Sequence, residues 1–286
     1  MTDYRDLWYQ SADGLKLYAR DYPGPADGLL PPALCMHGLT RNSADFAVLG
    51  GRLSEQRRVL SVDQRGRGRS DYDSNVTNYT PATYVQDMFA LLDGEGIDRV
   101  VLVGTSMGGL MSFLMAAMQP ERIAAMIIND IGPEIDPAGL ARIQDYVGKS
   151  GPVNTWEQAV AQQKAINGIA FPDFTEQQWQ DFARGLYREQ DGQPVIAYDP
   201  AIAQPMADQD SGAVPPDLWP VFEAITTIPM LVIRGATSDI LAPSCVDKMR
   251  ELDPDLQVAE IPDRGHAPML DEPTARSAID DFLQSL

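Results

Sequence analysis

Residues 100–109 read Val100-Val101-Leu102-Val103-Gly104-Thr105-Ser106-Met107-Gly108-Gly109. The first residues of this stretch are apolar without alternation, which predicts a strand covered on both faces. A Gly-x-Ser-x-Gly pattern follows directly, and helical patterning begins after it. Between a strand and a helix, this pattern forms a sharp turn that leaves the serine hydroxyl exposed above the sheet. The stretch therefore predicts Ser106 as a catalytic nucleophile.

The regions on either side alternate between short β-branched runs and amphipathic runs, a pattern typical of a parallel sheet with helices on both faces. The strands are predicted at residues 7–10, 15–20, 33–36, 59–62, 100–103, 124–128, 230–233 and 257–261. The helices are predicted at residues 45–56, 81–95, 107–118, 243–251 and 273–284. A Gly-containing turn joins the first two strands, which are expected to form a hairpin.

The alternation stops between residues 133 and 216, where the pattern is helical, interrupted by Pro and Gly, and without a strand-like run. Structureless loops of this length are uncommon inside a compact domain, so we expect a helical subdomain, the cap, over residues 133–216. Residues 1–132 and 217–286 then form the core domain. Most aromatic residues of the cap are expected to build a local core: Trp156, Phe171, Phe174, Trp179, Phe182, Tyr187 and Tyr198.

The charge balance narrows the classes of partner. The chain has 286 residues, with 22 Lys and Arg against 41 Asp and Glu, which gives a formal net charge of −19. Affinity for polyanions requires clustered Lys and Arg that displace counterions, so nucleic acid and an anionic membrane surface are both disfavoured. With 44% hydrophobic residues the chain can bury a sizeable core. We expect a small-molecule substrate, and the oligomeric state stays open.

The first residues, MTDYRDLWYQ, include acidic side chains and lack the apolar run of a secretory signal. No stretch reaches the ~20 apolar residues that cross a bilayer. Cys35 and Cys245 are the only cysteines, too few for a disulfide framework. These features predict a reduced, cytoplasmic protein. Two cysteines and two histidines are also too few for a Cys/His zinc cluster. Nothing in the sequence requires a metal or an organic cofactor, so none is expected.

A set of motifs, taken in order, resembles the α/β-hydrolase superfamily. They are His37-Gly38, the turn Asp63–Ser70, the Ser106 turn, Arg234–Asp239 and Gly265-His266. The resemblance extends from about Leu7 to Leu286 and leaves out only the insertion. It implies an α/β-hydrolase fold: a mostly parallel eight-stranded sheet with helices on both faces, and a helical cap that roofs the catalytic pocket.

Serine is a poor nucleophile at its free pKa, so Ser106 requires a base, usually a histidine that a carboxylate orients. The chain has two histidines, His37 before Ser106 and His266 far after it. The order of catalytic residues in α/β hydrolases is Ser, then Asp or Glu, then His. This order predicts His266 as the base. By resemblance, His37 has a structural role in its loop.

The orienting acid is expected after a strand near the carboxyl edge of the sheet. Asp239 follows the strand at residues 230–233 by a short loop and matches the acid position that is usual in the family. Asp130, directly after the strand at 124–128, is the alternative, since some members take the acid from that strand end. We predict Asp239 as the acid, which would hold the imidazole in the right tautomer and stabilise the imidazolium.

Attack on a carbonyl produces an oxyanion, which backbone N–H groups stabilise. The N–H of Met107, next to the nucleophile at the start of a helix, is predicted as one donor. The resemblance implies the N–H of Leu39, after His37-Gly38, as the second.

The segment Asp63-Gln64-Arg65-Gly66-Arg67-Gly68-Arg69-Ser70 invites comparison with phosphate and dinucleotide loops. A dinucleotide fingerprint opens a helix after the first strand, whereas this segment continues into the turn-rich run Asp71–Asn75. The resemblance implies instead a structural turn whose arginines pair with acidic neighbours.

Ser106 excludes, by resemblance, the dehalogenase and epoxide-hydrolase branches, which carry aspartate at that position. The run Ser106–Gly109 resembles arylesterases, enol-lactonases and perhydrolases. We predict a serine hydrolase that cleaves a small to medium, largely apolar carboxylic ester or lactone through an acyl-enzyme. One alternative is a carbon–carbon bond hydrolase of an activated diketone, although Ala267 stands where such enzymes often carry Trp. The other is a non-catalytic or very slow ligand receptor on the same fold.

Overall fold

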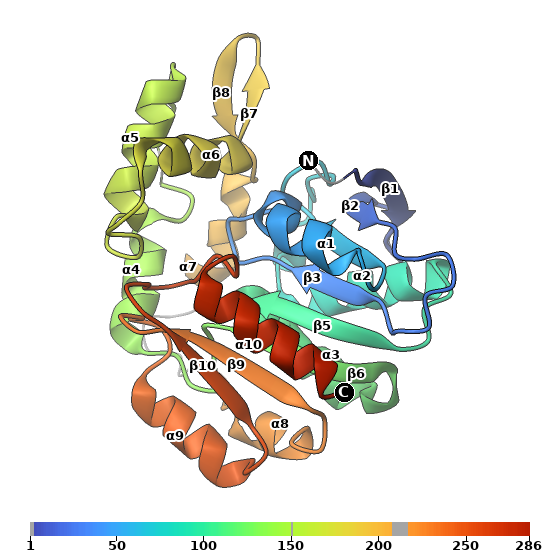
Figure 1. Ribbon diagram of the computed structural model, residues 1–286. Helices are drawn as coiled ribbons and strands as arrows, with labels where there is room; N and C mark the ends of the chain where they lie inside the picture. The colour runs from blue at the N-terminus through green and yellow to red at the C-terminus, as the bar shows by residue number, and fades with distance from the viewer. Residues whose placement is uncertain (1–2, 150, 208–216) are drawn as a thin grey trace.

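The computed structural model describes residues 3–149, 151–207 and 217–286 (Figure 1). Its main feature is an eight-stranded sheet with the order β1-β2-β4-β3-β5-β6-β9-β10. The hairpin of the first two strands is antiparallel, β2 pairs antiparallel with β4, and the other neighbours are parallel. All eight predicted strands are present, and the predicted fold class is confirmed. The strands are β1 (Arg5–Gln10), β2 (Lys16–Tyr22), β3 (Ala33–Met36), β4 (Val59–Asp63), β5 (Val100–Thr105), β6 (Ile123–Asn129), β9 (Met230–Gly235) and β10 (Gln257–Ile261).

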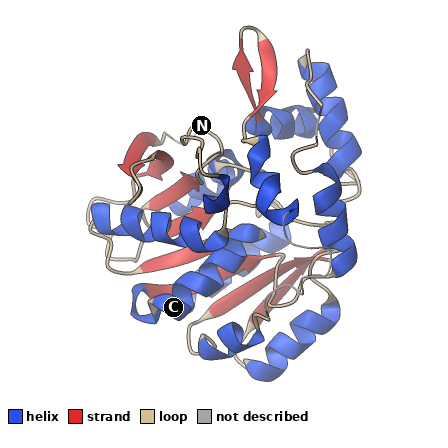
Figure 2. Ribbon diagram, turned by 180° about the vertical axis from the view of Figure 1, so that it is seen from behind, coloured by secondary structure: helices blue, strands red, loops and turns tan. Residues whose placement is uncertain are grey.

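Helices cover both faces of this sheet (Figure 2). One face packs against α1 (Ala47–Leu53) and α10 (Pro273–Gln284). The other face packs against the remaining helices of the core, which are α2 (Pro81–Gly94), α3 (Met107–Met118), α8 (Trp219–Ala224) and α9 (Pro243–Leu252). The predicted helix at residues 45–56 is divided, because a 3₁₀ turn, η1 (Ser43–Phe46), precedes α1.

Strand β5 shows why its apolar run lacks alternation. Successive side chains of a strand point to opposite faces. Val100 and Leu102 pack against the helices of one face, and Val101 and Val103 pack against α1 and α10 on the other. All four residues are at most 1% exposed. Burial of each such side chain contributes about 1.5–3 kcal/mol, so the central strands form a rigid base for the loops at their carboxyl ends.

The cap contains α4 (Pro137–Tyr146), α5 (Trp156–Asn167), α6 (Glu176–Leu186) and α7 (Gln204–Ala207), which lie along one side of the core in Figure 1. The prediction that this segment has no strands is wrong, because β7 (Tyr187–Gln190) and β8 (Gln193–Ile196) form an antiparallel hairpin. Asp191 and Gly192 connect them with φ values of 51° and 78°, the positive values that a two-residue hairpin turn requires. Residues 208–216, at the end of the predicted cap, lie outside the described residues, and the domain boundaries stay a prediction.

A local aromatic core holds the cap together. Phe171 and Phe174 stack with ring centroids 4.4 Å apart, and Trp179 and Phe182 pack edge-on or tilted against both. Tyr187 belongs to the same cluster. The expected aromatic core is therefore present, whereas Tyr198 packs with the core domain instead.

Candidate active site

Ser106 occupies the turn between β5 and α3. Its φ of 53° and ψ of −115° are strained for a residue with a side chain, as the predicted sharp turn requires. The glycines on either side are needed because the chain passes very close to itself. A Cβ at Gly108 would lie 2.0 Å from the carbonyl oxygen of Met36, and one at Gly104 would lie 2.3 Å from that of Gly108. The sequence pattern and the strained turn thus agree on an exposed hydroxyl at the carboxyl edge of the sheet.

His266 lies on the loop that follows β10 and meets Ser106. The distance from Ser106 Oγ to His266 Nε2 is 2.8 Å, and from His266 Nδ1 to Asp130 Oδ2 it is also 2.8 Å. Because the carboxylate can only accept, Nδ1 carries the proton and Nε2 is free to accept the proton of Ser106. The structure therefore brings Ser106 and His266 together as predicted, in the tautomer that a general base requires.

The prediction that Asp239 lies beside the imidazole is wrong. Its carboxylate turns toward the cap and pairs with Arg142 of α4, whose Nη2 lies 2.8 Å from Asp239 Oδ1. Hydrogen bonding to Arg142 lowers the pKa of Asp239. The loop after β9 instead directs the neighbouring residue, Ser238, to the site, where its hydroxyl donates to Asp130 Oδ2 at 2.6 Å.

Asp130 takes the position beside His266 because of its backbone. It follows the last residue of β6 with a φ of 58°, a left-handed conformation that Asp tolerates better than most residues. Its carboxylate is fully buried and also accepts the backbone N–H of Gly235 at 2.8 Å. Ser238 and this N–H hold the carboxylate in a fixed orientation. The sequence leaves Asp130 as the alternative acid, because the choice between Asp130 and Asp239 depends on a turn that strand patterning does not specify.

The two backbone groups expected at the oxyanion lie on the loop after β3 and at the start of α3. A Cβ at Gly38 would lie 3.6 Å from Ser106 Cβ, so this loop passes directly beside the nucleophile. Leu39 follows Gly38 and lines the same cavity as Ser106 and His266. Met107 is the first residue of α3, where backbone N–H groups have no partner within the helix. This placement supports Leu39 and Met107 as donors, and their role stays a prediction.

His37 is fully buried beneath this loop. Its Nε2 accepts the backbone N–H of Gln64 at 3.0 Å, so its Nδ1 carries the proton and donates to the carbonyl oxygen of Gly38 at 2.7 Å. Burial lowers the pKa of His37 to about 3, which keeps the ring neutral. These contacts agree with a structural role in shaping the loop.

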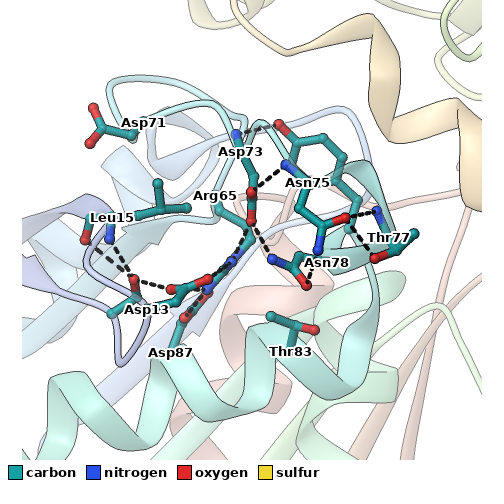
Figure 3. Close-up of polar contacts among 12 residues, drawn as sticks. Asp13, Leu15, Arg65, Asp71, Asp73, Asn75, Thr77, Asn78, Thr83 and Asp87 are labelled. Carbon is teal, nitrogen blue, oxygen red and sulfur yellow. Dashed lines mark hydrogen bonds and ion pairs between the residues drawn. The ribbon is translucent and has the colours of Figure 1, made fainter.

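The arginines of the turn after β4 differ in their partners. Arg65 is surrounded by the carboxylates of Asp13, Asp73 and Asp87 at 2.6–2.8 Å (Figure 3), and Arg69 pairs with Asp6. The expected acidic pairing therefore holds for these two residues.

Arg67 does not follow that expectation. It is fully buried, and no carboxylate of the described residues pairs with it. Its Nε donates to the carbonyl oxygen of Leu39 at 2.9 Å, and its Nη1 donates to the Tyr84 hydroxyl at 2.8 Å. Its Nη2 lies 4.0 Å from Met107 Sδ. A buried cation thus contacts both residues expected to stabilise the oxyanion, a feature for which the sequence offered no signal.

A cavity of about 100 Å³ lies between the core domain and the cap, over Ser106 and His266. Its walls are largely apolar, and Arg41 and Asp45 are the charged pair in its described lining. The apolar walls come from both parts of the chain: Ile143, Ile166, Phe171, Phe182, Leu186, Ile196, Met269 and Leu270. Phe171 and Phe182 therefore serve the local core of the cap and the wall of the cavity together.

This fold, with a serine at the turn after β5 hydrogen-bonded to a histidine, defines an α/β hydrolase. The chain belongs to the α/β-hydrolase fold family, whose model matches residues 31–273. It is 33% identical to the 3-hydroxybutyrate-oligomer hydrolase of Cupriavidus necator, over 87% of each chain. It is 28% identical to the 2-(acetamidomethylene)succinate hydrolase of Mesorhizobium japonicum, over 82% of this chain and 81% of that one.

Solved structures agree. A crystal structure of an α/β hydrolase from Novosphingobium aromaticivorans is 43% identical, covers both chains completely and superimposes with a TM-score of 0.93. The structure of E-2-(acetamidomethylene)succinate hydrolase is 26% identical, with a TM-score of 0.82 over 99% of this chain and all of that one. The chain is accordingly a hydrolase.

The described residues lack two features. None of their helices combines the length and the apolar character needed to cross a membrane. Nor do these residues gather three or more His, Cys, Asp or Glu side chains in an arrangement that could bind a metal ion.

Proposed function

We propose that this protein hydrolyses small carboxylic esters through an acyl-enzyme on Ser106. The observation that carries the proposal is the continuous hydrogen-bonded chain from Ser106 through His266 to Asp130, with both links at 2.8 Å. This geometry can remove the hydroxyl proton as the oxygen attacks, which an unassisted serine cannot do at neutral pH.

The reaction would proceed in two stages. His266 Nε2 takes the proton of Ser106 as Oγ bonds to the ester carbonyl carbon. The oxyanion that forms accepts hydrogen bonds from the backbone N–H groups of Leu39 and Met107. The imidazolium then protonates the departing alcohol, which leaves an acyl group on Ser106. A water molecule activated by His266 releases the acid and restores the serine. Throughout, the Asp130 carboxylate orients the ring and stabilises its positive charge.

The size and walls of the cavity favour a short acyl group. An engineered protein cavity of about 150 Å³ holds a benzene molecule, so the space here suits an acyl chain on the order of four carbons. The relative in Cupriavidus necator is named for oligomers of 3-hydroxybutyrate, which are joined by ester bonds between four-carbon units. We therefore propose linear esters of short hydroxy acids as the substrate class.

The test is hydrolysis of p-nitrophenyl esters with acyl chains of two to twelve carbons, together with the dimer of 3-hydroxybutyrate. Wild type and Ser106→Ala are compared side by side. We expect turnover of about 1–10³ s⁻¹ by the wild type on short esters and on the dimer, and none by the variant. If wild type and Ser106→Ala hydrolyse all esters equally slowly, the proposal is wrong. Fewer than one event per minute with tight retention of the ligand would point to a receptor, and turnover of diketones alone to carbon–carbon cleavage.

A further inference from the structure

Arg41 lies in the catalytic cavity at a short distance from the nucleophile. It belongs to the loop between β3 and η1, and its backbone N–H donates to the carbonyl oxygen of Gly38 at 3.1 Å. A Cβ at Gly38 would lie 3.6 Å from Arg41 Cγ and equally 3.6 Å from Ser106 Cβ. The aliphatic part of the Arg41 side chain and Ser106 therefore lie on either side of Gly38, and both residues line the cavity.

Two neighbouring side chains, those of Asp45 and Phe182, fix the guanidinium group of Arg41. Nε donates to Asp45 Oδ2 at 2.7 Å, and Nη2 donates to Asp45 Oδ1 at 2.6 Å. The group also lies over the ring of Phe182 in the cap, 4.1 Å from its centroid. Both side chains of the ion pair are 15% exposed. The planar group is thus held on one edge by a carboxylate and on one face by an aromatic ring.

The other edge of the guanidinium stays open. A guanidinium has five N–H donors, and Asp45 uses one from Nε and one from Nη2. Among the described residues, Nη1 and the second N–H of Nη2 donate to no protein group. These donors form a parallel pair along the edge opposite Nε, an arrangement that matches the two oxygens of a carboxylate. Among the described residues that line the cavity, Arg41 is also the only one with a cationic side chain.

We propose that the open edge of Arg41 binds a carboxylate of the substrate, a few bonds from the ester that Ser106 attacks. The substrate class is then an ester that also carries a free carboxylate, such as a linear oligomer of a hydroxy acid. This inference rests on the ester hydrolysis proposed above and adds what the enzyme recognises beyond the scissile bond.

The surroundings of Arg41 lower the free-energy cost of binding a carboxylate. Because Asp45 and Phe182 already immobilise the side chain, binding costs little additional rotamer entropy. Asp45 also keeps the empty site neutral, which lowers the cost of holding a cation in an apolar cavity. The net charge of −19 repels an anion only over a limited range, because exposed charges are screened beyond about 8 Å at physiological salt. At contact distance, the hydrogen bonds from the guanidinium edge determine the affinity for the substrate carboxylate.

The experiment compares two matched pairs of substrates, each an acid and its neutral methyl ester, and follows cleavage of the ester bond that the two members share. One pair is the dimer of 3-hydroxybutyrate and its methyl ester, which place the carboxylate on the alcohol side. The other is monoethyl succinate and ethyl methyl succinate, which place it on the acyl side. The measured quantity is the ratio of kcat/KM for the acid to kcat/KM for its neutral ester. We expect this ratio to fall at least about tenfold in Arg41→Leu for one pair, and by less in Arg41→Lys, which keeps the charge but loses the paired donors.

Arg184→Leu is the control. Arg184 is an exposed cap arginine that lies over the Trp156 ring at 4.6 Å, and it does not line the cavity. Its removal should leave the ratio unchanged. If Arg41→Leu lowers kcat/KM for acid and ester by the same factor in both pairs, Arg41 only fastens the loop to the cap and the inference is overturned.

Binding is measured separately, so that failure of the proposed reaction can be told apart. In Ser106→Ala, calorimetry should show tighter binding of the acid than of its methyl ester. The added change Arg41→Leu should remove that preference. Binding without a preference for the acid would overturn the inference even if hydrolysis is observed. A preference for the acid without hydrolysis by the wild type would keep the Arg41 subsite and reject the proposed function.

Discussion

Asp130 and Asp239 follow neighbouring strands of the sheet, but only Asp130 contacts the imidazole of His266. We expect Asp130→Asn to lower kcat by about 10³–10⁴, because an amide can donate to Nδ1 and so stabilise the wrong tautomer. Asp239→Asn removes an ion pair with the cap and should lower kcat less than about tenfold. Steady-state kinetics on a short p-nitrophenyl ester measures both variants. A larger loss of kcat in Asp239→Asn would mean that Asp239, on the loop after β9, is the orienting acid.

Arg67 is a second residue whose surroundings suggest a role in the reaction. It is fully buried, has no carboxylate partner within the described part of the chain, and donates to the carbonyl oxygen of Leu39. Its positive charge lies in a low-dielectric region beneath the oxyanion donors, where it favours developing negative charge. We expect Arg67→Met to lower kcat at least about tenfold with a small change in KM.

The test of Arg67 as a positioning residue uses an inhibitor that mimics the tetrahedral oxyanion, such as an alkyl trifluoromethyl ketone. Its affinity should fall in parallel with kcat in Arg67→Met, while circular dichroism reports an intact fold. Arg69→Met, which removes an exposed pair with Asp6, is the matched control. Unchanged inhibitor affinity alongside reduced kcat would show that Arg67 does not act through the oxyanion.

At the scale of elements, the cap and the His266 loop are in direct contact. The backbone N–H of Gly265 donates to the carbonyl oxygen of Ala170 at 3.0 Å, and a Cβ at Gly265 would lie 2.8 Å from Ala170 Cα. We expect Gly265→Ala to push the cap and the His266 loop apart, which should lower kcat at least about tenfold since small displacements of a catalytic group are costly. The midpoint of thermal unfolding should also fall.

Gly94→Ala is the control for that substitution, because a Cβ at the end of α2 meets nothing within 4 Å. It should leave kcat unchanged and leave the thermal midpoint equal or slightly higher. Equal kinetics of Gly265→Ala and wild type would mean that the His266 loop does not depend on its contact with the cap.

The predictability of the elements follows from the range of the interactions that form them. Strands buried on both faces leave a continuous apolar run, so β5 and β9 were predicted from local sequence alone. The hairpin of β7 and β8 was missed although Asp191-Gly192 is a known turn signal, because its strands expose most of their residues and show little apolar patterning.

The residues of the candidate site also differ in the range of the interactions that place them. Ser106 and His266 were predictable because a local turn motif and chain order specify them. The choice between Asp130 and Asp239 depended on loop conformations that bring residues about a hundred positions apart into contact, which no local pattern encodes. The open edge of Arg41 likewise depends on where the cap places Phe182.

At the scale of the whole molecule, the excess of acidic residues makes stability depend on how carboxylates are paired. Arg65, whose side chain is 2% exposed, holds the hairpin turn through Asp13, the loop after β4 through Asp73 and helix α2 through Asp87 (Figure 3). One buried guanidinium therefore connects three separate segments of the chain. The hydrogen bond from Arg65 lowers the pKa of Asp13 to about 2.

A carboxyl whose pKa is lower in the folded than in the unfolded state stabilises the fold above its unfolded pKa of about 3.9, and this contribution is lost as the pH falls through the folded value. We expect the free energy of unfolding of wild type to exceed that of Asp13→Asn at pH 6 and the difference to shrink toward pH 2.5. Urea titrations at fixed pH steps measure both. Asp27→Asn, at an exposed residue without an ion pair among the described residues, is the control. A difference that stays constant or widens in acid would mean that Asp13 does not stabilise the fold through its charge on Arg65.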